Sequence, residues 1–408
     1  PRSTPKPSSA ASDVYKRQES VGSKPKAVVD EAVNQGELAF AVAAIGNSEG
    51  QLWAHAAGHR DINQRHTATS DNIIQIASMT KLVTSIAALQ LVERGLLALD
   101  EPADVHIAEL ANLRVLTGFD AGGKGQFEDA RRAPTVRELI THTAGFVYEI
   151  WNENEVRAVS TGLAESFLGG GNFLVNPLAF QPGTQWEYGT NTDWLGALIE
   201  QRSGERLVDY FEKNIFDPLG MKDTHFELPE DKLHRSVAMM ARAEEQMIAS
   251  PSNQPVSRDR HSMPFYSGGG GLYSTVDDYG SVLQMLLSAG TVSGSQVLSA
   301  STVDDMFDNH IGDLRPGPLV TQVPEVSNTA DLGFAAPATF GLGLLIHPEG
   351  LPGGRRPNTG SWAGLFNTYY WVDRASDLYG IFGTQILPFY DAATISTLAR
   401  FEQAVYSG

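Results

Sequence analysis

One short segment places a hydroxyl and an amine where they could act together. Ser78-Met79-Thr80-Lys81 sits at the start of a predicted helix, and the spacing puts Ser78 and Lys81 on one face within reach of each other. A buried lysine is more easily kept neutral, and a helix N-terminus disfavours its charge while it favours an oxyanion at the serine. The pair therefore fits a serine nucleophile activated without histidine. The alternative is an N-cap serine beside a solvated lysine.

A tyrosine further along the chain is a candidate general base. Trp186-Glu187-Tyr188-Gly189-Thr190-Asn191 follows a Gln-Pro-Gly turn and precedes a predicted helical stretch over 194–200. A tyrosine in such a turn can project its phenol into a cleft and take the proton of Ser78. The alternative is a half-buried tyrosine with a packing role.

A segment rich in small residues offers a backbone donor. Asn358-Thr359-Gly360-Ser361-Trp362-Ala363-Gly364-Leu365 leads into a predicted strand. Small residues let a substrate lie close to the backbone, and the N–H of Leu365 could point at a developing oxyanion. The alternative is an ordinary glycine-containing turn.

Other catalytic patterns are absent from the sequence. There is no G-x-S-x-G elbow, no H-E-x-x-H zinc motif and no phosphate-binding loop. With zero cysteines, a thiolate nucleophile and a sulfur-based metal site are excluded. We interpret His142 as a hydrogen-bonded structural residue and Gly268–Gly271 as a tight bend before a helix. We therefore expect no cofactor and no metal.

Composition and charge narrow the possible partners. The 408 residues are 42% hydrophobic and 19% charged, which is typical of a folded enzyme. A formal charge of −18 repels nucleic acid and anionic lipid headgroups. No apolar run approaches the roughly 18 residues of a membrane span. The sequence thus predicts a soluble protein that binds neither nucleic acid nor a membrane.

The predicted elements place the candidate residues between a sheet and a helical region. Strands are expected over 40–45, 52–57, 340–346, 366–372 and 378–387, and helices over 26–35, 78–94, 274–290 and 392–405. Because strands gather at the two chain ends, we predict an α/β (α+β) fold in which both ends form one mostly antiparallel sheet, flanked by helices and interrupted by a helical insertion. The expected divisions are a disordered or non-native leader (1–22), the sheet domain (23–75 plus 335–408), a mainly helical domain (76–315) and a loop (316–334).

Taken in order, several segments resemble the serine β-lactamase and penicillin-binding-protein superfamily, its class C-like branch and, within it, the family VIII carboxylesterases. These segments are 77–93, 139–145, 181–200, 269–287, 340–344 and 360–387. The resemblance implies a β-lactamase/transpeptidase-like fold, Ser78 as the acylated nucleophile, Lys81 as the partner sharing its proton, and Tyr188 as general base. It also implies an oxyanion hole of the Ser78 and Leu365 amides, and a cleft lined by Trp362-Ala363-Gly364.

Two departures from the superfamily pattern bear on the substrate. Thr190 stands where lactamases and peptidases usually carry asparagine, and Trp362-Ala363-Gly364 stands where they carry Lys-Thr-Gly. Losing a charge-assisted contact of about 1.5 to 3 kcal/mol would weaken carboxylate binding roughly tenfold to a hundredfold. An aromatic residue suits an uncharged acyl or alcohol group instead. Arg355 and Arg356 keep an anionic β-lactam open as an alternative.

These features together predict a serine esterase that acts on short-chain carboxylic esters through an acyl-enzyme. An alcohol could intercept the same acyl-enzyme, so transesterase activity is compatible with this prediction. The alternatives are a β-lactamase or D-amino-acid peptidase-like amide hydrolase, and a catalytically silent binding protein. The expected partner is a small-molecule ester, and the protein is expected to be a monomer or a homodimer. Cytoplasmic localisation is favoured, with a periplasmic or secreted location as the alternative, since a native N-terminus could be missing.

Overall fold

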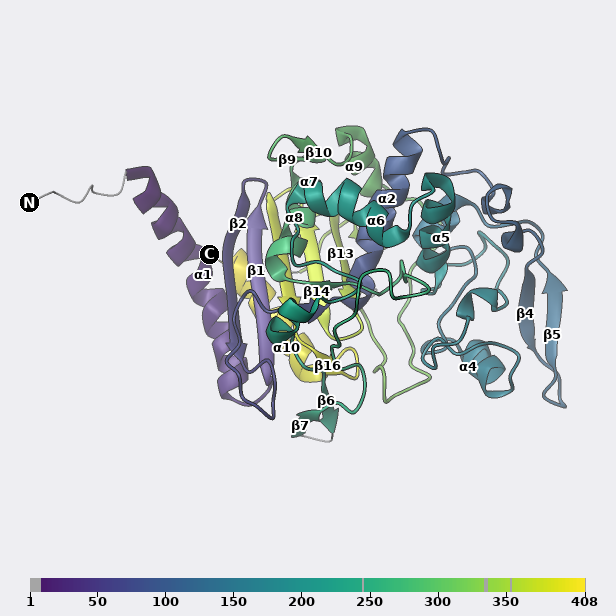
Figure 1. The fold of residues 1–408 in the computed structure, drawn as a ribbon, viewed down its shortest axis with the longest axis horizontal. Coiled ribbons are helices and arrows are strands. Elements are labelled where there is room, and N and C mark those ends of the chain that lie inside the picture. The colour runs from purple at the N-terminus through teal and green to yellow at the C-terminus, as the bar shows by residue number, and fades with distance from the viewer. Residues whose placement is uncertain (1–8, 244–245, 334–336, 353, 408) are drawn as a thin grey trace, which may run out of the picture.

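A computed structural model of the chain describes residues 9–243, 246–333, 337–352 and 354–407 (Figure 1). Its central feature is a seven-stranded antiparallel sheet. In spatial order the strands are β11 (Thr339–Phe340), β12 (Leu345–His347), β13 (Thr359–Gly364), β14 (Thr368–Asp373), β15 (Leu378–Gly383), β1 (Phe40–Asn47) and β2 (Gly50–Gly58).

The two ends of the chain meet between β1 and β15. Val42 pairs with Gly383 and Gly46 with Tyr379, so an N-terminal hairpin extends a sheet built from C-terminal strands. Because β1 lies inside the sheet with both faces covered, its residues from Phe40 to Gly46 are all buried. The predicted fold class is confirmed.

Alternating side chains of the sheet contact helices on opposite faces. Tyr370 of β14 packs against Tyr279 of α8 (Val276–Leu287), with ring centroids 5.3 Å apart. The next residue, Trp371, points to the other face and packs against Phe401 of α10 (Ala392–Tyr406) at 6.0 Å. Helix α1 (Ser9–Asn34) lies beside α10 and β2 at the edge of the molecule (Figure 1). The sheet is thus the middle layer of three.

The helical region begins where the chain leaves this sheet. A short turn of helix, η1 (Ala77–Met79), leads into α2 (Thr80–Glu93), whose residues from Thr80 to Leu91 are all buried. Helix α2 packs against α5 (Asn191–Ser203), on the side of the sheet away from α1 (Figure 1). The remaining α-helices are α3 (Val136–Thr141), α4 (Glu153–Ser160), α6 (Leu207–Phe211), α7 (Asp217–Leu219) and α9 (Ala300–Met306).

Several elements differ from the sequence-based expectations. The predicted strand over 340–346 is two strands, β11 and β12, because Gly343 turns the chain at φ +92°. The segment leading to Leu365 is itself a strand, β13, although its small residues resemble a turn. Short strand pairs also occur outside the main sheet: β3 (Ile74–Gln75) with β8 (Tyr273–Ser274), β4 (Arg114–Phe119) with β5 (Gly125–Asp129), β6 (Met240–Ala243) with β7 (Gln246–Ala249) and β16 (Ile386–Leu387), and β9 (Thr291–Val292) with β10 (Ser295–Gln296).

A helix begins within the segment expected as a disordered or non-native leader (1–22). Helix α1 begins at Ser9, so residues 9–22 are helical, and residues 1–8 lie outside the described residues. Alanine, lysine, arginine, glutamine and glutamate make up six of the fourteen residues of this stretch and favour a helix. The domain divisions, the leader included, stay a prediction.

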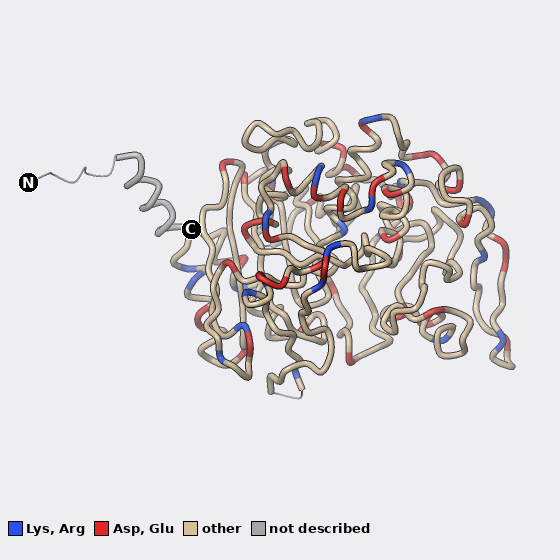
Figure 2. Tube along the Cα trace, in the orientation of Figure 1, with Lys and Arg blue, Asp and Glu red and all other residues tan. Residues whose placement is uncertain are grey.

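Charged residues are spread over the molecule. Figure 2 shows Asp and Glu positions over both the sheet and the helical region, with Lys and Arg positions between them. Within the described part of the chain, no helix has the length and apolar character needed to cross a bilayer.

Candidate active site

Ser78 lies at the strained entrance to α2. Ala77, directly before it, has φ of 44°, in the left-handed region that a residue with a side chain adopts only at a cost. The following residues enter α2, and Ser78 stays partly exposed while Ala77 and Met79 are buried. This turn presents the Ser78 hydroxyl to a cavity of about 570 Å³.

Lys81 directs its amine toward Ser78 from one helical turn away. Its side chain is only 3% exposed. The amine donates to Ser78 Oγ at 3.3 Å, to Tyr148 Oη at 3.0 Å and to the carbonyl of Gly269 at 2.7 Å. An ammonium has three N–H donors, so the three acceptors match its full donor capacity. The structure brings together the predicted pair of Ser78 and Lys81.

Two tyrosines flank this amine in different ways. Lys81 Nζ lies 4.8 Å from the ring centroid of Tyr188, so that tyrosine presents its aromatic face to the amine. The Tyr188 hydroxyl accepts from Trp362 Nε1 at 3.4 Å, and the hydrogen bonds of the described residues include none from it to Ser78 or Lys81. Tyr148 instead bonds Lys81 through its hydroxyl and lines the cavity. Burial holds the pKa of Tyr148 well above its ordinary value.

Tyr148 is the site residue that sequence reasoning missed. It stands in the loop after α3, 67 positions from Lys81, with no motif around it that distinguishes it from a packing tyrosine. Its ring packs on Phe167 with centroids 4.8 Å apart, so it also forms part of the apolar cavity wall. Only the path of this loop brings it to the lysine.

The end of β13 is pressed against the turn that carries Ser78. A Cβ on Gly364 would overlap the carbonyl oxygen of Ile76 and the hydroxyl of Thr368. Thr368 Oγ1 also donates to the Ile76 carbonyl at 3.3 Å. Because glycine permits this approach, Leu365 lies on the same cavity as Ser78. This arrangement is compatible with the predicted oxyanion hole, in which the backbone amides of Ser78 and Leu365 would both donate to the carbonyl oxygen of the substrate.

The residues predicted to bind substrate lie deeper than the cavity. Thr190, Trp362 and Ala363 are 4%, 5% and 4% exposed, and neither they nor Gly364 are among the residues that line it. The Trp362 ring packs on Tyr188 at 4.9 Å and stacks on His142 at 6.4 Å. The structure thus places Trp362 in an aromatic cluster behind Lys81, and its predicted contact with substrate stays a prediction.

His142 belongs to this aromatic cluster. Burial lowers the pKa of His142 well below its ordinary value, and the nearby Lys81 acts in the same direction, so the imidazole is neutral. Its Nδ1 pairs with Asn191 Nδ2 at 3.1 Å, and that amide nitrogen also donates to the carbonyl of Phe146 at 2.9 Å. These contacts agree with the structural role predicted for His142.

The wall of the cavity is largely apolar. Ile150, Trp151, Phe167, Leu168 and Leu387 contribute to it, and Ser250, Ser252 and Asn253 add polar groups. Glu325 is the one charged side chain among the described residues that line it.

The arginines expected to bind a carboxylate lie elsewhere. Arg355 donates to both carboxylate oxygens of Glu402 at 2.9 Å, and its guanidinium lies over the ring of Trp371. Neither Arg355 nor Arg356 lines the cavity at Ser78. Among the charged side chains that line this cavity, an anionic substrate would meet Glu325 and neither arginine.

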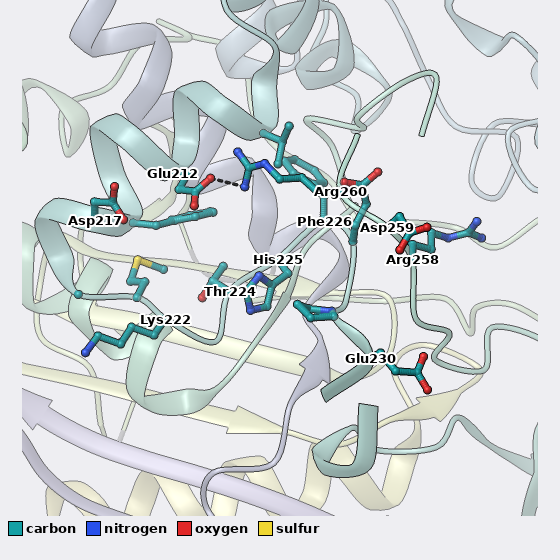
Figure 3. A pocket seen from close by; sticks show the side chains of 16 residues that line it. Glu212, Asp217, Lys222, Thr224, His225, Phe226, Glu230, Arg258, Asp259 and Arg260 are labelled. Atoms are coloured by element: carbon teal, nitrogen blue, oxygen red, sulfur yellow. Dashed lines mark ion pairs between the residues drawn. The ribbon is translucent and has the colours of Figure 1, made fainter. Parts of the chain in front are cut away.

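A second cavity of about 540 Å³ lies near α6 and α7 (Figure 3). Its charged groups include Glu212 and Arg260, which form an ion pair with each other. Burial lowers the pKa of its His225 to about 4. This cavity shares no lining residue with the one at Ser78, and its described residues include no serine and lysine pair.

Neither cavity has a metal-binding cluster among its described residues. Within the described parts of the chain, no group of three or more histidine, aspartate or glutamate side chains could hold a metal ion.

The sheet, the helical insertion and the Ser78–Lys81 pair define the serine β-lactamase-like class of proteins. The Beta-lactamase family model matches residues 26–403, and the chain belongs to that family. It is a serine hydrolase or acyltransferase of that family, in its class C-like branch.

Its relatives include enzymes of both kinds. The chain is 32% identical over 362 residues to monacolin J acid methylbutanoyltransferase of Aspergillus terreus, covering 85% of each chain. It is 29% identical over 393 residues to lovastatin esterase of Penicillium rubens, covering 88% of this chain and 91% of that one. Among solved structures, simvastatin synthase from Aspergillus terreus superposes with a TM-score of 0.81 at 27% identity, covering 95% of this chain and 98% of the other.

Proposed function

We propose that this protein is a serine carboxylesterase that cleaves short-chain, uncharged esters through an acyl-enzyme on Ser78. The observation that carries the proposal is the Ser78 hydroxyl, which faces an apolar cavity with the Lys81 amine 3.3 Å behind it. Two relatives support ester chemistry, since one is named as an esterase and another as an acyltransferase.

In the first half-reaction Ser78 Oγ attacks the ester carbonyl carbon. A tyrosine oriented by Lys81 takes the serine proton and returns it to the leaving alcohol when the carbon–oxygen bond of the ester breaks. The amides of Ser78 and Leu365 stabilise the oxyanion between these events. Water then attacks the acyl-enzyme by the reverse proton route and releases the acid, and an alcohol in the place of water gives transesterification.

We assign the base to Tyr188 and the orientation of Lys81 to Tyr148. The resemblance to the superfamily supports Tyr188, whose ring faces the amine, and the 3.0 Å hydrogen bond supports Tyr148. Hydrogen bonds of a catalytic base often tighten only when substrate is bound, so the present position of the Tyr188 hydroxyl is compatible with this role.

The wall of the cavity supports an uncharged substrate. Its lining is mostly apolar, its one described charged side chain is Glu325, and Arg355 and Arg356 lie outside it. A carboxylate, as in a β-lactam, would therefore meet like charge and no described cation on that wall.

The test is a panel of p-nitrophenyl esters with nitrocefin as one substrate, assayed on the wild type and on Ser78→Ala. Ser78→Ala should lower ester turnover roughly 10³- to 10⁶-fold. A fluorophosphonate probe should add to Ser78 in the wild type, as mass spectrometry would detect. Wild-type ester rates in folded Ser78→Ala would refute the proposal, and a preference for nitrocefin above about a hundredfold would favour the amide-hydrolase alternative.

A further inference from the structure

The glycine run Gly268–Gly271 lies between α2 and α5. The carbonyl of Gly268 accepts from Thr84 Oγ1 at 2.6 Å, and the carbonyl of Gly269 accepts from Lys81 Nζ at 2.7 Å, both from α2. On the opposite side, a Cβ at Gly268 would lie 2.7 Å from the Thr192 carbonyl of α5. The run, interpreted from sequence as a tight bend, therefore connects the lysine to α5.

The residue of α5 that holds this run is Asp193. Its side chain is 0% exposed, and its Oδ1 accepts from Ser267 Oγ at 2.6 Å and from the backbone N–H of Gly269 at 3.1 Å. Its Oδ2 is buried and has no hydrogen-bond partner among the described residues. A methyl at Gly269 would lie 2.5 Å from that oxygen, so a residue other than glycine would displace the carboxylate.

The charges of Asp193 and Lys81 are buried together. Burial raises the pKa of Asp193, and the positive charge of Lys81 is the strongest influence that opposes it. The ion pairs of the described residues include no carboxylate within 4.0 Å of Lys81, so the two charges interact at longer range, with Gly269 hydrogen-bonded to both groups. A buried ammonium without an opposite charge nearby would be costly.

We propose that Asp193 is a positioning residue for Lys81. Its carboxylate fixes Gly269, the Gly269 carbonyl fixes the amine, and the amine lies against the Ser78 hydroxyl, over successive distances of 3.1, 2.7 and 3.3 Å. Asp193 does not line the cavity, so it acts on the turnover of bound substrate rather than on its binding. This inference rests on the proposed function, because Lys81 assists catalysis only if Ser78 is the nucleophile.

Other titratable groups also face this pair. Tyr148 and Tyr188 pack against the Lys81 amine, and His142 lies behind Tyr188 with its ring centroid 4.9 Å away. His142 is neutral, and burial holds the pKa of Tyr148 above its ordinary value. Asp193 is therefore the carboxylate whose removal should change the electrostatics of the amine.

The test compares Asp193→Asn with the wild type on p-nitrophenyl butyrate between pH 5 and 9. The substitution keeps the side-chain size and one acceptor oxygen but removes the charge. The kcat should fall roughly tenfold with KM unchanged. The acidic limb of the kcat/KM profile should move to lower pH, because a buried negative charge beside the site is gone.

Asp278→Asn is the matched control. Asp278 is also buried, and it accepts from one backbone N–H, of Asp223 at 2.6 Å, and from one hydroxyl, of Thr224 at 2.9 Å, away from Lys81. This variant should keep the wild-type pH profile. A merely structural role for Asp193 predicts that both variants lose stability and keep the profile, and that result would overturn the inference.

A second variant covers the case in which Asp193→Asn does not fold. Gly269→Ala keeps Asp193 in the sequence, but the added methyl pushes its carboxylate away from residue 269. This variant should lower kcat roughly tenfold in folded protein. Wild-type kcat in folded Gly269→Ala would overturn the inference. An inactive wild type that the fluorophosphonate probe does not label at Ser78 would instead refute the proposed function.

Discussion

Lys81 donates a 3.0 Å hydrogen bond to the hydroxyl of Tyr148, whereas it meets Tyr188 through the face of the ring, 4.8 Å from the centroid. The two tyrosines therefore do different things to the same amine. One fixes the direction of an N–H bond, and the other stabilises positive charge and keeps its own hydroxyl near Trp362.

The first prediction separates the two tyrosines by single substitutions to phenylalanine. Tyr188→Phe should lower kcat roughly 10²- to 10⁴-fold across pH 6 to 9, because the general base is lost. Tyr148→Phe should lower it roughly tenfold, because one hydrogen bond to the ammonium is lost. Steady-state kinetics on p-nitrophenyl butyrate measures both. A larger loss in Tyr148→Phe than in Tyr188→Phe would transfer the role of base to Tyr148.

The second prediction concerns the close approach of β13 to the nucleophile turn. Gly364→Ala places a methyl against the Ile76 carbonyl and should push Leu365 away from Ser78. A displacement of about 1 Å at an oxyanion donor should lower kcat/KM roughly a hundredfold. Gly317→Ala is the control, since a Cβ there meets no atom within 4 Å. Equal kinetics in the two variants would remove the end of β13 from the site.

The third prediction concerns pH and stability at Glu155. Burial raises the pKa of this carboxyl to about 7, Asn176 opposes the shift through a hydrogen bond, and Glu149 and Glu187 add to it. Between pH 4.5 and 7 the unfolded chain releases the proton that the native state keeps, so the free energy of unfolding should decrease as pH rises through this window.

In the wild type, the contribution of Glu155 should lower the free energy of unfolding by up to about 3 kcal/mol between pH 4.5 and 8. Glu155→Gln should abolish that decrease. Urea unfolding at both pH values measures it. Glu153→Gln changes an exposed carboxylate of the same helix and should leave the pH dependence of the wild type unchanged. If both variants show the same pH dependence, Glu155 is ionised in the native state.

The fourth prediction concerns acyl-chain length. Leu168 lines the cavity at Ser78 and is 42% exposed, so Leu168→Ala should widen the apolar wall near its opening. The ratio of kcat/KM for p-nitrophenyl octanoate over butyrate should rise roughly threefold to tenfold. Leu163→Ala truncates a leucine of similar exposure, 44%, that does not line the cavity. An equal change in both variants would mean that Leu168 does not contact the acyl chain.

Local sequence patterns predicted much of the architecture. Ser78 and Lys81 are one helical turn apart, so helix geometry alone placed them together, and the strand-rich chain ends indicated a shared sheet. Strand β13 was harder to predict, because its two glycines reflect close contacts rather than strand propensity: Gly364 lies against the Ile76 carbonyl, and Gly360 lies against Phe307.

Other relationships in the site depend on packing between distant segments. Tyr148 and Gly269 lie 67 and 188 positions from Lys81, and no local pattern indicates that their oxygens meet its amine. Likewise, Arg355 is directed away from the cavity by Glu402, which is 47 positions further along the chain. Helix periodicity is a property of neighbouring residues and can be inferred from sequence. The hydrogen bonds that orient Lys81 form only once α2 has packed against the loop that carries Tyr148 and the glycine run that carries Gly269. The partners of a buried amine are set by the segments that enclose it.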